Sequence, residues 1–252
     1  MSSFEPTTMA FPSPSPPPLH CQPSRARSPT RITAIRRIAV YRSQIDVWHF
    51  LVDNRPELWS ETAIHARLVA VALLIAVPPA VALGVAAAGR PRLASLAVGT
   101  AGVIFTIPSL ALFALLVGPL GLGTGPAVAA LALYSVLPVL RNTVVGLDEV
   151  PAEAIEAARG MGMTETQALW RVRLPLALPV VLGGVRVAAV TAVGIATVAA
   201  LVAAGGLGDS IFAGLRAGDD TQVLAATAVI AALALAVDAT LALVERGLRR
   251  GR

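Results

Sequence analysis

The feature that most constrains this chain is a set of long apolar runs without a charged residue. Residues 68–89 lie between Arg67 and Arg90, and the uncharged run 93–140 is too long for one membrane helix. A helix that crosses a bilayer needs about 20 mostly apolar residues. Only 14% of the 252 residues are charged, whereas soluble domains have about 25%. These features predict a polytopic membrane protein.

The apolar runs divide into five predicted spans. The stretch GPLGLGTGP at 118–126 breaks the longest run, because glycine and proline favour a turn. The predicted spans are 68–89, 93–117, 126–140 (which can extend past Arg141), 187–204 and 221–244. We therefore predict an all-α polytopic membrane protein with about five transmembrane helices.

The placement of arginine predicts how these spans are oriented. The 20 basic residues are all arginines, and outside the first 45 residues most lie between spans one and two, between spans three and four, and after span five. Cytoplasmic segments of membrane proteins carry the excess of basic residues. We expect these three segments to be cytoplasmic, with the N-terminus outside and the C-terminus in the cytoplasm. Because the arginines lie at the ends of apolar runs rather than on one face, the net charge of +5 does not indicate a nucleic-acid partner.

The first 45 residues differ from the rest. They are rich in Pro, Ser and Arg, a composition that cannot pack a core. We expect residues 1–45 to be a disordered tail, or a stretch that arises from a start codon assigned too far upstream, and residues 46–252 to form the transmembrane domain. The single cysteine, Cys21, excludes an internal disulfide and a cysteine-based metal cluster. The three histidines show no metal-ligand spacing, so no metal site is predicted.

A charged segment interrupts the apolar runs at 149–179. Pro151 suits the first turn of a helix, and the following AEAIEAAR is a strong helix-forming sequence. Gly160 and Gly162 allow the chain to turn sharply. A first short helix is therefore predicted, followed by a turn.

A second short helix is predicted directly after that turn. Thr164 can cap it, with Gln167 three residues later as the capping-box partner, and we expect it to end near Leu174 and Pro175. Two short helices at an angle could form a solvated loop, a helix on the membrane surface, or an element that fits a groove of a partner protein. The acidic first helix disfavours the membrane surface, since anionic lipid would repel it.

This segment resembles the cytoplasmic EAA loop of the permease subunits of binding-protein-dependent ABC importers. The motif is Glu-Ala-Ala, a glycine after three further residues, and, after a fixed gap, a β-branched residue, one free position, Leu and Pro. The chain has these residues at that spacing: Glu156, Ala157, Ala158, Gly162, Val172, Leu174 and Pro175. Valine stands where isoleucine is more common. The resemblance covers about residues 47–252 and implies the type I ABC importer permease fold.

In that family the loop is a coupling helix that lies in a groove of the ATP-hydrolysing subunit. A small-residue face (Ala154, Ala157 and Ala158) would allow close approach to that subunit, and two glutamates would offer charge for pairing. The resemblance implies these ATPase-coupling residues: Glu153, Glu156, Ala157, Ala158, Gly160, Gly162, Leu174 and Pro175. The chain contains no phosphate-binding loop with its lysine. It is therefore expected to have no catalytic residues and no cofactor of its own.

The resemblance also implies partners and a location. They are an ABC ATPase that binds ATP and Mg, a second permease chain (identical or paired), an extracytoplasmic substrate-binding protein, and the lipid of the bacterial cytoplasmic (inner) membrane.

Further stretches resemble one branch of these permeases, which imports the quaternary-amine osmoprotectants glycine betaine, carnitine and choline. They are TIPSLALFALL (106–116), YSVLPVLRNTVVGL (134–147), EAARGMGMT and AAGGLGDSIFAGL (203–215). An alternative is an ABC permease for an amino acid such as methionine, since the glycine run at 205–208 is shared more widely. A third hypothesis, a polytopic membrane enzyme, needs a nucleophile and base or a metal cluster within the spans, and the sequence indicates neither.

Polar residues within the apolar runs are candidates for the translocation path. Proline in a membrane helix frees a backbone carbonyl, which must find a partner or line a polar cavity. The predicted path residues are Thr106, Pro108, Ser109, Tyr134 and Asn142, with a packed kink at Pro108 as the alternative. The residues Gly205, Gly206 and Gly208 are predicted to form an external gate or a contact with the binding protein, with a simple loop as the alternative.

Three further features of the spans are the small-residue stripe, Arg186 and Asp238. Small residues recur every four positions from 184 to 200, a pattern that lets helices approach closely within one chain or between two permeases. Arg186 is predicted to lie just before the fourth span and to extend to the cytoplasmic interface. Asp238 lies inside the fifth span, where a carboxylate is costly. It is expected to be hydrated near the cytoplasmic side or to pair with a residue such as Arg141.

Overall fold

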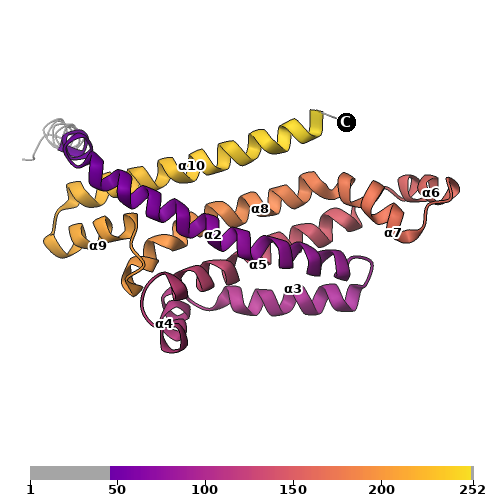
Figure 1. Ribbon diagram of the computed structural model, residues 1–252, viewed down its shortest axis with the longest axis horizontal. Coiled ribbons are helices and arrows are strands. Elements are labelled where there is room, and N and C mark those ends of the chain that lie inside the picture. Colours follow the sequence, from indigo (N-terminus) through magenta and orange to yellow (C-terminus); the bar gives the residue numbers. More distant parts are fainter. Residues whose placement is uncertain (1–45, 251–252) are drawn as a thin grey trace, which may run out of the picture. The chain divides into compact units, whose positions relative to one another are not determined.

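The computed structural model describes residues 46–250, so the predictions for residues 1–45 lie outside the described residues. The elements are helices joined by short turns: α2 (Arg55–Ala87), α3 (Pro91–Thr106), α4 (Ser109–Leu120), α5 (Thr124–Asp148), α6 (Ala152–Gly160), α7 (Glu165–Ala168), a π-helical turn (Leu169–Arg173), α8 (Leu174–Ala196), a 3₁₀ turn (Thr197–Val202), α9 (Leu207–Ala217) and α10 (Asp220–Arg250). Figure 1 shows α6 and α7 at one end of this bundle and α9 at the other.

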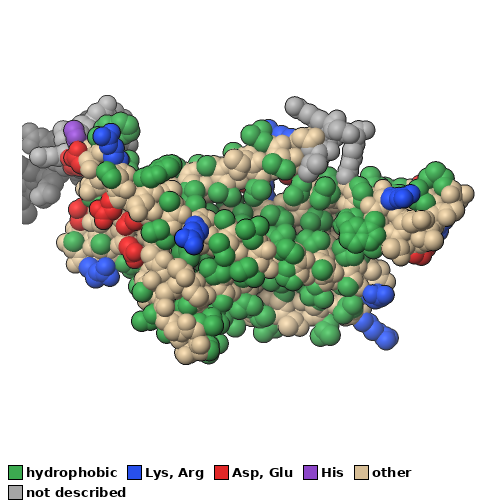
Figure 2. Space-filling view, viewed as in Figure 1, with side chains coloured by type: hydrophobic (Ala, Val, Ile, Leu, Met, Phe, Trp, Pro, Cys, Tyr) green, Lys and Arg blue, Asp and Glu red, His purple; other side chains and the backbone are tan. Residues whose placement is uncertain are grey.

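Four helical stretches of the described residues are long and apolar enough to cross a membrane. They are α2, α5, the continuous stretch Glu165–Val202 and α10. The pair α3 and α4, bent by 94° at their junction, makes a fifth span if it is counted as one. Hydrophobic side chains cover the middle of the bundle in Figure 2, while acidic ones gather at the α9 end. The predicted all-α fold with about five spans is confirmed.

The predicted boundaries of the spans are less accurate than their number. Helix α2, which contains the first predicted span, begins at Arg55, well before the predicted residue 68, and α8 begins at Leu174 instead of residue 187. Helix α5 continues past Arg141 to Asp148, which agrees with the predicted possibility that the third span extends past Arg141. A charged residue ends an apolar run, but the backbone hydrogen bonds of a helix continue through it. Apolar run length therefore underestimates the helices that extend beyond the membrane.

Helix α5 lies between α2 and α8 and packs closely against both. A Cβ atom placed on Gly84 of α2 would lie 2.6 Å from Thr143 Cβ of α5, and one on Gly184 of α8 would lie 2.6 Å from Asn142 Cβ. Only glycine permits such close helix contacts. The small-residue stripe continues from Gly184 through Ala188, Ala192 and Ala196, all of which are buried. The stripe therefore packs within this chain, as its structural interpretation predicted.

The break between α3 and α4 lies at Ile107 and Pro108. The backbone carbonyl of Ile107 accepts a hydrogen bond from the buried Tyr134 hydroxyl of α5. The Tyr134 ring meets Phe105 edge to face, with centroids 5.7 Å apart. The carbonyl exposed by the break thus has a partner inside the protein, and the geometry is that of a packed kink.

Candidate functional site

The EAA segment begins with helix α6, which ends in a turn that requires glycine. Met161 caps the helix, and Gly162 follows with a φ of +77°. The N–H of Gly162 donates to the Arg159 carbonyl, and the N–H of Met163 donates to the Ala158 carbonyl. This pair of bonds defines a Schellman motif, whose left-handed position favours glycine. Gly160 is the last residue of α6 and does not have a positive φ, so Gly162 alone makes the turn.

The capping box predicted for the second helix is present. Thr164 Oγ1 accepts a hydrogen bond from the N–H of Gln167, and Gln167 Oε1 accepts one from the N–H of Thr164. An exposed ion pair links the two helices across the turn, with Arg159 Nη2 2.9 Å from Glu165 Oε1. These local contacts fix the angle between α6 and α7.

The second helix does not end near Leu174 and Pro175, contrary to the prediction. It continues through the π-helical turn Leu169–Arg173 directly into α8. In that turn the N–H of Leu174 donates to the Leu169 carbonyl, five residues back. A wider turn accommodates Pro175, which lacks an N–H and would clash with a carbonyl of a regular helix. The proline therefore shifts the register of the helix without ending it.

Apolar side chains attach this element to the membrane helices. Ile155 of α6 and Leu169 of the π-helical turn pack, together with Leu174, against a buried cluster formed by Leu147, Val150, Ala177 and Val181. Arg173 Nη2 also donates to the Leu147 carbonyl, at 3.2 Å. The EAA segment thus contacts the neighbouring ends of α5 and α8 through one continuous core, and α8 is its direct extension.

The outer surface of the EAA segment is exposed. Glu153, Glu156, Ala157, Gly160 and Gly162 are all exposed. Met161 is 69% exposed and Trp170 is 60% exposed. Large apolar side chains that face outward beside acidic ones are typical of a surface that binds a protein partner.

The predicted small-residue face is partly wrong. Ala158 is completely buried within this chain, and Ala154, Leu174 and Pro175 are half-buried. Ala158 therefore has no surface available for contact with a partner. Helical periodicity could not distinguish a face that packs internally from one that packs on a partner.

The predicted path residues fall into two separate places. Thr106, Pro108, Ser109 and Tyr134 lie together at the α3–α4 break, where the Thr106 hydroxyl donates to the Val103 carbonyl. Asn142 lies two turns further along α5, where its Nδ2 donates to the Pro138 carbonyl. The structure does not bring Asn142 to the kink. The role of both places in transport stays a prediction.

The Gly205–Gly208 region is tightly packed. Gly205 and Gly206 have φ values of +79° and +96°. A Cβ on Gly206 would lie 3.3 Å from the Nδ1 atom of the buried His65, and one on Gly208 would lie 2.1 Å from the Thr197 carbonyl oxygen. The function of these glycines as a gate stays a prediction. Their need for glycine follows from close packing against α2 and the 3₁₀ turn.

Polar contacts also hold α2 against α9 and α8. The Ser210 hydroxyl donates to Glu61 Oε2 at 2.6 Å, and His65 Nε2 lies 3.0 Å from the Val193 carbonyl, to which it donates. Burial raises the pKa of the neighbouring Asp209 carboxyl, an effect that Arg216 partly opposes. The region at this end is therefore an ordered polar contact between helices.

The sequence did not indicate the ion pair that joins α8 to α10. Arg186 lies inside α8, not before it, and its guanidinium makes a two-pronged contact with the Asp238 carboxylate of α10. Asp238 pairs with Arg186 and not with Arg141, the partner that the sequence suggested. The partners are 52 residues apart in the chain, and only the packing of α8 against α10 brings them together.

Comparisons with known proteins agree with these features. The sequence profile of the "Binding-protein-dependent transport system inner membrane component" family matches residues 80–250. The osmoprotectant import permease protein OsmW of Salmonella typhimurium is 42% identical over 77% of this chain and 93% of its own length. The choline transport system permease protein OpuBB of Bacillus subtilis is 38% identical over 79% of this chain and 92% of its own length.

Solved structures show the same fold. An inward-facing form of the MetNI methionine ABC transporter matches with a TM-score of 0.64 at 23% identity, over 76% of this chain and 94% of its own. An amino acid ABC transporter crystallised with histidines matches with a TM-score of 0.66 at 20% identity, over 78% of this chain and 96% of its own. Because the family profile covers well over half of the sequence, this chain belongs to the binding-protein-dependent transport system inner membrane components.

Proposed function

We propose that this chain is the permease subunit of an ABC importer that moves quaternary ammonium osmoprotectants, such as glycine betaine, carnitine and choline, into the cytoplasm. ATP is hydrolysed by a separate subunit. The observation that carries the proposal is the EAA segment, which presents exposed acidic and apolar side chains at one end of the bundle and is continuous with a membrane helix.

The contacts of the EAA segment suggest how force reaches the membrane. A groove of the ATPase would hold α6, with Glu153 and Glu156 available for pairing with basic groups and Met161 for apolar contact. A rigid movement of that groove would displace α7, and with it α8, because one helix runs through both. The cluster around Leu147 would carry the same movement to α5.

The solute class is supported by the relatives. Relatives that are 36–42% identical over most of this chain carry names for osmoprotectant, choline or carnitine transport. The alternative, import of an amino acid such as methionine, has weaker support. The solved amino-acid transporters are at most 23% identical, which is a likeness of fold.

Four partners complete the proposed machine. They are the ABC ATPase with its ATP and Mg, a second permease chain, an extracytoplasmic substrate-binding protein and the lipid of the inner membrane. The chain itself would contribute no catalytic residue. The arginine-rich segments support a cytoplasmic C-terminus, with α6 and α7 on the cytoplasmic side and the Gly205–Gly208 region and the start of the first span outside.

Uptake measurements test the proposal. A strain that lacks this gene but retains the partner genes should not accumulate labelled glycine betaine or choline, and the restored gene should recover uptake of both. Equal uptake with and without the gene would contradict the proposed solutes.

Crosslinking tests the proposed coupling separately. Cys21 is the only cysteine, so a Cys21→Ser chain with Glu156→Cys should crosslink to the ATPase. Absence of that crosslink, with Trp170→Cys as a second position, would contradict the proposed coupling.

A further inference from the structure

Arg186 and Asp238 form an ion pair, and each lies within a helical stretch that is long and apolar enough to cross a membrane. Arg186 is 12 residues beyond the start of α8, and Asp238 is 18 residues beyond the start of α10. At about 1.5 Å of rise per residue, these positions are about 18 Å and 27 Å along their helices. Both charges are therefore far from the end at which their helix begins.

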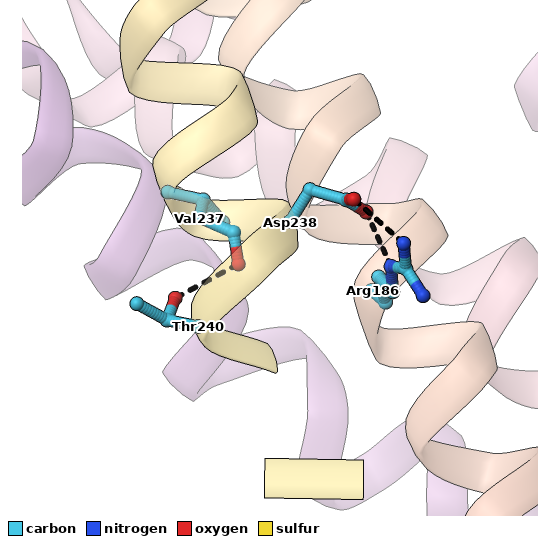
Figure 3. Close-up of polar contacts among 4 residues, drawn as sticks. All are labelled: Arg186, Val237, Asp238 and Thr240. Atoms are coloured by element: carbon cyan, nitrogen blue, oxygen red, sulfur yellow. Dashed lines mark hydrogen bonds and ion pairs between the residues drawn. The ribbon is translucent and has the colours of Figure 1, made fainter. Parts of the chain in front are cut away.

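The pair is also incompletely covered by its own chain. The side chains of Arg186 and Asp238 are 37% and 33% exposed, and Figure 3 shows them pointing toward each other from α8 and α10. They line a cavity of about 540 Å³ together with Asn142 of α5 and Thr191 of α8. The volume falls within the range of about 300–1,000 Å³ that small-molecule sites occupy.

Lipid is a poor neighbour for such a cavity. Charged side chains within membrane helices face the bundle interior or a water-filled cavity, because hydrocarbon does not solvate them. The opposite side of α10 is different: the pocket there, beside Thr240, is lined almost wholly by apolar residues such as Val69, Leu233 and Val237. The polar side of α10 therefore faces water or another polar surface, and the apolar side does not.

We propose that Arg186, Asp238 and Asn142 form a solute subsite in the translocation path, which takes the two opposite charges of a zwitterion. The inference rests on the proposed function. The guanidinium of Arg186 binds the carboxylate of the solute, and the carboxylate of Asp238 attracts its quaternary ammonium. Asn142 supplies an amide at the rim of the same cavity.

The chemistry of the pair suits such a solute. A guanidinium has five N–H donors, and the contact with Asp238 uses Nε and Nη2, so a second carboxylate can approach the same group. A quaternary ammonium has no N–H and interacts by charge alone, which a carboxylate provides without a fixed direction. A zwitterion can also separate the two side chains without leaving a charge unpaired. Its carboxylate then pairs with Arg186, and its ammonium group pairs with Asp238. A weak site of this kind is suited to passage, since the solute must also leave.

The test compares a zwitterion with a cation. Arg186→Gln should lower uptake of glycine betaine on the order of tenfold relative to uptake of choline, which has no carboxylate, because a charge-assisted hydrogen bond is lost. Asp238→Asn should lower uptake of both solutes. Thr240→Val, on the apolar side of the same helix (Figure 3), should leave the ratio of the two rates at the wild-type value.

Two double variants separate binding from folding. Arg186→Gln with Asp238→Asn removes both charges together, so neither is left unpaired, and should still favour choline over glycine betaine relative to wild type. Arg186→Asp with Asp238→Arg restores an ion pair with the charges exchanged. If the exchanged pair restores uptake of both solutes in the wild-type ratio, the pair is only structural and the proposal is wrong. A wild-type chain that imports neither solute would contradict the proposed function instead.

Accessibility gives an independent readout. Val187 lines the same cavity and is 54% exposed. In a Cys21→Ser chain, Val187→Cys should react with a charged, water-soluble thiol reagent, and glycine betaine should slow that reaction. If Val187→Cys instead resists the reagent and forms a disulfide between two permease chains, the face is a contact between chains and the proposal is overturned.

Discussion

The two ends of the bundle both contain a turn made by glycine, and the two turns have opposite surroundings. A Cβ atom on Gly162, between α6 and α7, would meet nothing within 4 Å, whereas one on Gly208, at the start of α9, would lie 2.1 Å from a backbone oxygen. Gly162 is required only for its left-handed backbone conformation. Gly208 is required because there is no space for any side chain.

The difference separates an exposed surface, which we propose binds the ATPase, from a packed contact. At the α6–α7 end the turn is surrounded by exposed side chains such as Glu156 and Met161. At the α9 end the turn lies against the buried His65 and the Ser210–Glu61 hydrogen bond. Changes at the first end should alter function more than stability, and changes at the second should alter stability first.

Gly208→Ala tests the packed end and should have the largest effect. The added methyl group must displace the Thr197 carbonyl or the Ala200 side chain, to which it would lie at 2.9 Å. Overpacking of this kind lowers the free energy of unfolding by about 1–3 kcal/mol and occasionally more. Because the methyl group would meet a backbone oxygen at close range, we expect a loss at the upper end of this range, about 3 kcal/mol. Thermal unfolding of the purified protein in detergent should show a clear fall in Tm.

Gly194→Ala is the matched control for that measurement. Gly194 lies inside α8, and a Cβ there would meet nothing within 4 Å. Alanine is favoured over glycine within a helix by about 0.5–1 kcal/mol, so this variant should keep or slightly raise Tm. Equal losses of Tm in the two variants would show that the tight contact at Gly208 does not exist.

Gly162→Leu tests the exposed end, where we expect a large loss of function with a modest loss of stability. A side chain at a left-handed position costs about 1–2 kcal/mol, which is expected to distort the turn between α6 and α7. Solute uptake, and stimulation of the partner ATPase by solute, should both fall at least about tenfold. Tm should change less than in Gly208→Ala.

Gly160→Leu separates the backbone effect from the bulk of the side chain. Gly160 lies two residues earlier, is exposed, and has no positive φ. If the turn is what matters, this variant should retain more uptake than Gly162→Leu. Equal uptake in the wild type and the Gly162→Leu variant would contradict the coupling role of this turn.

Much of the fold could be predicted because the membrane imposes it. Lipid requires helices of a known length, so apolar runs predicted about five spans, and a four-residue capping box predicted the start of α7. The ends of the helices could not be predicted in this way. Helix α2 extends back to Arg55, and α8 is continuous with α7, because backbone hydrogen bonding continues beyond the apolar region. The length of an apolar run does not mark where that hydrogen bonding stops.

The candidate site was predictable where it is local and not where it depends on packing. The EAA residues lie within one segment, and their spacing identified it. The Arg186–Asp238 pair depends on the contact between α8 and α10, and the burial of Ala158 depends on how α6 packs against its neighbour. A small side chain has the same appearance in a sequence whether it faces its own chain or a partner.

Arg173→Met tests the link between the EAA segment and α5 and should have a smaller effect. The substitution removes the hydrogen bond from Nη2 to the Leu147 carbonyl, which contributes about 1 kcal/mol. It also removes a buried Nε–H that has no hydrogen-bond partner within the described residues, which offsets part of the loss. Tm should fall slightly, and solute-stimulated ATPase activity should fall more than basal activity.

The control for this variant is Arg171→Met, at an exposed arginine two residues earlier. If both variants behave alike, Arg173 does not link the segment to α5.

Asp209→Asn should have the smallest effect, which depends on pH. Burial raises the pKa of this carboxyl in the folded protein above its ordinary value of 3.8, more than Arg216 lowers it. Between these two pKa values the folded chain holds more protons than the unfolded chain, so stability falls as pH rises through this window.

The Asp209→Asn substitution removes the cost of burying this carboxylate. The Asp209→Asn variant should therefore unfold at a slightly higher Tm than wild type at pH 7, and the difference should shrink as pH is lowered toward 4. A variant that is less stable at pH 7 and recovers at low pH would show that the carboxylate stabilises the α9 end, and would weaken the contrast between the packed α9 end and the exposed α6–α7 end.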